Sequence, residues 1–143
     1  MESFSSNKSA TYYSGSQVGE LINLPQKTGK HRVDAWEGQV VHILENGDVP
    51  EWGNETEVHM HESDLWIGLS GEVTFVVGGT LKEWSYRKNA DSTDNLNEIK
   101  APKIENGITY TLRAGDVLEI PAGVPHTHFG TGKLFIIKIP SVK

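Results

Sequence analysis

Three histidines are spaced in a way that suits metal binding. His59 and His61 are two residues apart in a segment with strand character, so both imidazoles are expected to project from the same face. His126 follows a Pro-Ala-Gly-Val-Pro turn much further along the chain, and only a fold that returns the chain brings it beside the first pair. Three imidazoles and a carboxylate would make a site for a first-row transition metal.

The residues around His59 alternate in polarity, as expected for a strand with one polar face. Acidic groups and imidazoles share one parity and apolar side chains take the other: Glu55, Glu57, His59 and His61 against Val58 and Met60. A polar row that faces into a barrel is costly unless it coordinates something. The alternative is that this face simply contacts water.

Two stretches of the chain resemble the two signature motifs of the cupin superfamily. The first motif is a glycine, five residues, His-x-His, three or four residues, a glutamate, six residues and a glycine; its matches are Gly53, His59, His61 and Gly71. The second is a glycine, five residues, proline, one residue, glycine, two residues, histidine, three residues and asparagine; its matches are Gly115, Pro121, Gly123 and His126. Asp64 stands at the glutamate position with only two residues between it and His61, and Gly130 replaces the asparagine.

The resemblance implies an all-β fold, the antiparallel double-stranded β-helix or jelly-roll barrel. It also implies one divalent metal ion, iron, manganese, nickel or zinc, with the ligands His59, His61, Asp64 and His126. Asp64 is one methylene shorter than glutamate, so Glu57 or Glu62 is the alternative carboxylate ligand. Such a site leaves one or two positions open on an octahedral ion, which catalysis needs.

Two further residues are candidates for the chemistry itself. His128 lies two residues after His126 on the same face and is either a proton-transfer residue with a pKa near neutral or a hydrogen-bonded histidine at the rim. Glu57 lies two residues before His59 on the same strand, so its side chain is expected on the same face as the histidine ligands. His31 and His42 have no partner at ligand spacing and are expected at the surface or the edge of the core.

The expected function is that of a metal-dependent enzyme, an isomerase, lyase or dioxygenase that acts on a small oxygenated molecule such as a sugar acid, keto acid or diketone. The alternative is a non-catalytic module that binds or senses a small ligand. The cupin fold hosts both classes, so the resemblance does not choose between them.

The remaining elements are read from short apolar runs between turn signals. A loose arm is expected over 1–17 and a single barrel domain over 18–143, with no helix of useful length.

Trp66 is expected to line the pocket or to lie in the core. Residues 88–95 are expected to form an exposed loop, which is either a plain insertion or a cover for the barrel. The predicted strands are 33–44, ended by a turn at 45–48; 65–69 and 72–77, joined by a turn at 70–71; 108–112; 117–120; and 127–129 and 134–139, joined by a turn at 130–133.

The composition of the chain limits the classes of molecule that it is expected to bind. The formal charge of −6 argues against nucleic acid or an anionic membrane as the main partner. The chain has no cysteine, so any metal must use nitrogen and oxygen ligands. We expect a cytoplasmic protein with a small-molecule partner, and a homodimer whose interface uses the arm and the strand at 134–139.

Overall fold

The computed structural model describes residues 2–34 and 40–141. Apart from one short helix, its elements are strands, and the strand pairs are antiparallel, which confirms the all-β expectation. The elements are α1 (Gly15–Ile22), β1 (Gly29–Arg32), β2 (Val41–Val49), β3 (Thr56–His59), β4 (Glu62–Val77), β5 (Thr80–Leu81), β6 (Ser85–Lys88), β7 (Asp94–Ala101), β8 (Ile104–Glu105), β9 (Ile108–Leu112), β10 (Val117–Ile120) and β11 (His126–Pro140).

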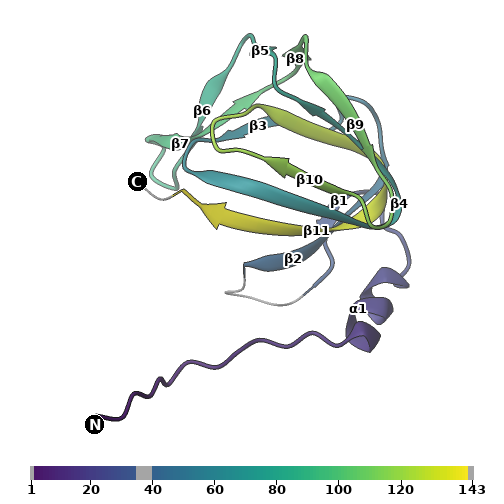
Figure 1. The fold of residues 1–143 in the computed structure, drawn as a ribbon. Helices are drawn as coiled ribbons and strands as arrows, with labels where there is room; N and C mark the ends of the chain where they lie inside the picture. Colours follow the sequence, from purple (N-terminus) through teal and green to yellow (C-terminus); the bar gives the residue numbers. More distant parts are fainter. Residues whose placement is uncertain (1, 35–39, 142–143) are drawn as a thin grey trace.

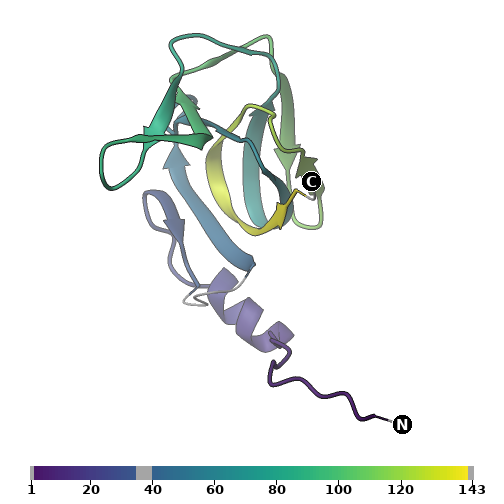
Figure 2. The same ribbon diagram turned by 90° about the vertical axis from the view of Figure 1, so that its left-hand side faces the viewer.

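The long strand β11 joins the two halves of the barrel. It pairs with β2, β3 and β4, and the main sheet runs in the order β1-β2-β11-β3-β7-β6, while β4 also pairs with β9 and β10. The sheet curls on itself in Figures 1 and 2, with β5 and β8 closing one end. Strands β9 and β10 have the predicted bounds.

Two predicted hairpins are wrong, because β4 and β11 each continue through the expected turn. The strands pair with one another along nearly their whole length and bend together where Gly71 lies opposite Gly132. A β-carbon on Gly71, whose φ is +69°, would lie 2.3 Å from the Thr131 carbonyl oxygen, and one on Gly132 would lie 2.5 Å from that of Ser70. These glycines therefore allow close approach at a bend and end no strand.

The predicted turn at 45–48 is also wrong, because these residues lie inside β2. Glu45, Asn46 and Gly47 are buried, and Gly47 pairs with Gly29 of β1. Polar residues are tolerated here because Gln26 donates hydrogen bonds to the Glu45 carboxylate and to the Asn46 carbonyl oxygen. Trp36, part of the predicted strand at 33–44, lies outside the described residues.

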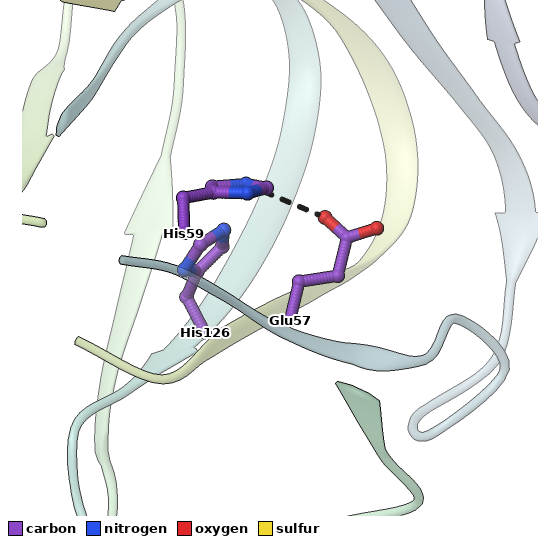
Figure 3. A group of neighbouring side chains, drawn as sticks. All are labelled: Glu57, His59 and His126. Carbon is purple, nitrogen blue, oxygen red and sulfur yellow. Dashed lines mark ion pairs between the residues drawn. The ribbon is translucent and has the colours of Figure 1, made fainter. Parts of the chain in front are cut away.

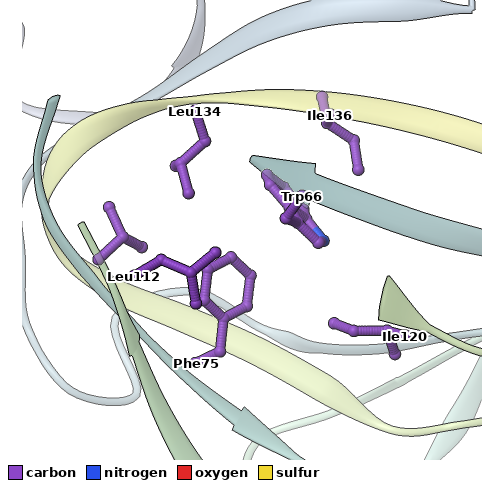
Figure 4. Close-up of a cluster of buried hydrophobic side chains, with 7 residues drawn as sticks. Trp66, Phe75, Leu112, Ile120, Leu134 and Ile136 are labelled. Carbon is purple, nitrogen blue, oxygen red and sulfur yellow. The ribbon is translucent and has the colours of Figure 1, made fainter. Parts of the chain in front are cut away.

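A compact apolar cluster fills the barrel (Figure 4). Trp66 packs against Phe75 with ring centroids 5.1 Å apart, so it is a core residue. The cluster comprises Trp66, Val73, Phe75, Leu112, Ile120, Leu134 and Ile136. The strand at 134–139, expected to take part in a dimer interface, lies between β2 and β4 for most of its length, and the homodimer stays a prediction.

The expectation of no helix of useful length did not foresee α1, a helix of 8 residues. Ser14 caps it, accepting a hydrogen bond from the Gln17 backbone N–H, while the Gln17 side chain accepts one from the Ser14 N–H. Buried Lys133 donates to the carbonyl oxygens of Ile22 and Leu24, which ties the end of the helix to the barrel. The chain before Ser14 extends away from the barrel in both ribbon views (Figures 1 and 2), and the predicted arm boundary at residue 17 falls inside α1.

Residues 88–95, predicted as an exposed loop, instead form the tip of the β6–β7 hairpin. Only 89–93 turn, closed by a hydrogen bond from the Asn89 N–H to the Thr93 carbonyl oxygen. The tip is exposed as predicted, and it projects from the barrel in Figure 2. Among the described residues, no helix is long and apolar enough to cross a membrane.

Candidate metal centre

Two of the predicted ligands, His59 and His126, come together inside the barrel. His59 is the last residue of β3 and His126 the first of β11, and β11 reaches β3 at the pair of His126 with Glu57. The two ring centroids lie 5.0 Å apart, and one ligand atom from each of Glu57, His59 and His126 falls within 4.8 Å of the others (Figure 3). Both histidines are buried.

Both imidazoles are oriented by a hydrogen bond through Nδ1. The His59 Nδ1–H donates to the Glu98 carboxylate at 2.6 Å, and the His126 Nδ1–H donates to the Val124 carbonyl oxygen at 3.0 Å. In neutral imidazoles this leaves the Nε2 lone pairs free to accept or to coordinate. Outer partners of this kind are typical of histidines that bind metals through Nε2.

Asp64 brings a carboxylate to the same place. Its Oδ2 lies 3.3 Å from His126 Nε2 and 3.5 Å from His59 Nε2. Burial alone would raise the pKa of Asp64, but the contacts with His126, His59 and Lys138 outweigh burial and hold this pKa well below its usual range. Asp64 Oδ2 and His126 Nε2 are buried without a hydrogen-bond partner, so two atoms that can donate electron pairs converge unsatisfied on one point.

Lys138, which belongs to neither sequence motif, also reaches this point. Its ammonium donates to Asp64 Oδ1 at 2.6 Å and to His59 Nε2 at 3.1 Å. It is placed by β11, where Lys138 pairs with Asp64 across the sheet. The signal was present, because buried Leu134 and Ile136 have the same parity and Lys138 is the next residue on their face.

The pKa values of Glu57 and His59 are set by the charges and hydrogen bonds around them. Burial raises the pKa of Glu57, but the charges of Lys30, His59, His126 and Arg87 lower it below its usual value overall. Burial likewise acts to lower the pKa of His59, yet the contact with Asp64 and the hydrogen bond to Glu98 raise it overall. Glu57 is therefore an ionised carboxylate, held by Arg87 at 2.9 Å, with its other oxygen 3.7 Å from His59 Nε2.

The structure does not bring His61 to this cluster. Strand β3 ends at His59 and the chain bends, so the parity that placed His61 beside His59 no longer applies. His61 is exposed and lines a surface depression of about 280 Å³ with Glu62, Asn95, Asn97 and Glu98. Because Glu98 also binds His59, this depression lies directly outside the cluster.

His128 is not the near-neutral group that was expected. It is buried between Trp66 and Phe75, with ring centroids 5.0 and 5.2 Å away, and its Nδ1 accepts a hydrogen bond from the Asn46 amide. Burial, reinforced by the charges of Lys30 and His126, lowers the pKa of His128 to about 3. The ring is therefore neutral at physiological pH. His42 and His31 are bound to Asp34 and to the Thr28 carbonyl oxygen, away from the cluster.

Comparison with solved structures identifies the fold. The chain is similar to a hydroquinone 1,2-dioxygenase solved with Cd²⁺ and 4-hydroxybenzonitrile, with a TM-score of 0.51 and 16% identity over 97% of this chain and 86% of that one. It also matches an oxalate oxidase solved with glycolate, with a TM-score of 0.45 and 18% identity over 84% of this chain, and spans about half, 54%, of that chain. No family model and no curated protein sequence matches it.

The antiparallel barrel and its likeness to the dioxygenase agree with the double-stranded β-helix that the resemblance to cupins implies. The chain shares the fold of that dioxygenase.

Proposed function

We propose that this protein is a metal-dependent enzyme that acts on a small oxygenated molecule, with a divalent ion held by His59, Asp64 and His126. The observation that carries the proposal is the convergence of two imidazole Nε2 atoms and the Asp64 carboxylate at one buried point. Ligand atoms on neighbouring positions of a first-row ion are roughly 3 Å apart, given metal–ligand bonds of about 2.0–2.2 Å. The contacts of Asp64 with the two imidazoles are close to that spacing.

The donor set also fits the chemistry of such an ion. Imidazole nitrogen with carboxylate oxygen suits iron, manganese, nickel or zinc. Glu57 is the candidate for a further ligand, because it is ionised and its Oε2 is 3.7 Å from His59 Nε2. A bound divalent ion would act as a Lewis acid toward substrate oxygens or, if it is iron, support the activation of dioxygen.

The chain's own residues would bind and orient the substrate. The depression outside His59 is lined by amides and carboxylates, which suit a molecule with several hydroxyl or carbonyl groups. Its volume of about 280 Å³ is near the lower end of the usual range for ligand pockets, so it favours a small substrate. His61 also lines this depression, where its exposed imidazole can form a hydrogen bond with a bound molecule.

The test is a screen for turnover with and without metal. Protein stripped by a chelator is loaded with iron(II), manganese, nickel or zinc and incubated with sugar acids, keto acids and diketones, and products are identified by mass spectrometry. We expect conversion with one of the ions that disappears in His126→Ala and persists in His31→Ala, a change distant from the cluster. Conversion that is equal with and without metal would contradict the proposal.

One observation favours a second candidate, a non-catalytic module for a small ligand. Lys138 already neutralises Asp64 and binds His59, so the cluster has a cation of its own. A cluster held together in this way needs no metal, so the depression beside it could bind a small polar molecule without catalysis. Saturable binding in calorimetry, with no product and no dependence on any of the four ions, would support this candidate over the enzyme.

A further inference from the structure

The ammonium of Lys138 occupies one donor atom that a metal ion would need, His59 Nε2, and binds the carboxylate that would supply another. It donates one hydrogen bond to Asp64 Oδ1 at 2.6 Å and another to the lone pair of His59 Nε2 at 3.1 Å. The Nδ1–H of His59 is already committed to Glu98, so Nε2 is the nitrogen left for either cation. His59 Nε2 can accept a hydrogen bond from Lys138 or coordinate a metal, but it cannot do both.

An ammonium and a divalent ion also repel one another at this distance. The Asp64 side chain is only 1% exposed, so the charges lie where water screens them poorly. Two cations a few ångströms apart in such a place are strongly unfavourable. Metal entry therefore requires that Lys138 leave.

The structure provides a second position for this side chain. The Glu62 Oε1 lies 3.8 Å from the Lys138 Nζ, and both side chains are about one-third exposed, 34% and 35%. Glu62 lines the depression that opens to solvent. A lysine on its flexible four-carbon stem can turn from Asp64 to Glu62 by rotations of its own side chain, with no change in the strand.

We propose that Lys138 is an exchangeable internal cation. In the metal-free protein its ammonium holds His59 and Asp64 in place, and on metal binding it moves to Glu62 at the mouth of the site. This inference rests on the proposed metal site and adds that Lys138 weakens and regulates metal affinity.

The test compares zinc affinity in variants that differ at position 138. Metal-stripped wild type, Lys138→Met and Lys82→Met are titrated with Zn²⁺ by calorimetry. Lys82 is the matched control, because its side chain is 71% exposed and pairs with Glu105 away from the cluster. Lys138→Met removes bonds that zinc must break, and hydrogen bonds to charged groups of this kind correspond to roughly 10- to 100-fold in a binding constant. We expect it to bind zinc tighter by about that factor, and Lys82→Met to match wild type.

Two further variants separate charge from packing. Lys138→Arg keeps a cation and should bind zinc no tighter than wild type, whereas Lys138→Gln is neutral and should behave like Lys138→Met. Lys138→Gln also serves if the methionine variant does not fold. Metal-free Lys138→Gln should melt below wild type and gain more in melting temperature from zinc.

The possible outcomes distinguish a failure of the role of Lys138 from a failure of the proposed metal site. Zinc binding of equal strength in wild type, Lys138→Met and Lys138→Gln overturns the role of Lys138 and leaves the metal site standing. Tighter binding in Lys138→Arg as well would show that charge is not the cause, and would also overturn it. Absence of binding in every variant, with each of the four candidate ions, removes the proposed metal site and this inference with it.

Discussion

Replacement of Asp64 by asparagine probes the buried charge at the centre of the site. The change keeps the shape of the side chain and removes its charge, leaving the Lys138 ammonium without its nearest counter-ion. Breaking a buried ion pair costs about 3–5 kcal/mol. Lys138 is partly exposed and can turn to Glu62 at 3.8 Å, so we expect the free energy of unfolding of the metal-free protein to fall by about 2 kcal/mol.

The control is the same substitution in an exposed pair. Asp94 bonds Lys88 at the hairpin tip, where both side chains are exposed, 46% and 62%. Pairs of this kind contribute less than about 1 kcal/mol. Both variants are unfolded with urea at pH 7 after metal removal. A loss for Asp64→Asn no larger than that for Asp94→Asn would refute the view that Asp64 is a buried carboxylate stabilised by its cation.

The difference between wild type and Asp64→Asn should also depend on pH in one direction. The folded pKa of Asp64 is lowered, so its contribution is fully present above its unfolded pKa of about 3.9 and is lost as pH falls through the lower folded value. Because Asp64 also raises the pKa of His59, the difference should not shrink between pH 7 and about pH 5, where His59 gains its proton, and should shrink only in stronger acid. A difference that vanishes near pH 6 would contradict the assigned direction of the shift.

Two other predictions test the fold and the buried histidine. Gly132→Ala should destabilise the protein in urea unfolding by several kcal/mol, because its β-carbon meets the Ser70 carbonyl oxygen at 2.5 Å, whereas Gly19→Ala in α1 has open space and should be neutral or slightly stabilising; equal effects would argue against the bend. The ring protons of His128 in NMR spectra should not titrate between pH 8 and pH 5, since its pKa is lowered to about 3, and a midpoint near 6.5 would show that the ring is not buried and neutral.

The fold was predictable because the cupin motifs are local in sequence and specific in spacing. Strands β9 and β10 were also predictable, as short alternating runs between turns. The failures at 70–71 and 130–133 share a cause. A glycine in a sequence can indicate a turn, or it can indicate a place where two backbones approach closely. Only the pairing of Gly71 with Gly132 shows that these glycines are of the second kind.

The site was only partly predictable for a similar reason. His59, Asp64 and His126 come together as the motifs implied, while His61 does not, because alternation ends with strand β3 and single-sequence patterns locate strand ends poorly. Glu98 reaches His59 only through the pairing of β3 with β7, a register between distant strands that no local pattern encodes.

The metal content of the purified protein tests the central claim most directly. Wild type, His126→Ala and His31→Ala are purified without chelator or immobilised nickel, and their metals are measured by elemental analysis. The geometry predicts about one equivalent of iron, manganese, nickel or zinc in wild type and His31→Ala, lost in His126→Ala. Wild type that holds no metal even after loading with each ion, or a His126→Ala variant that holds as much as wild type, would contradict the account.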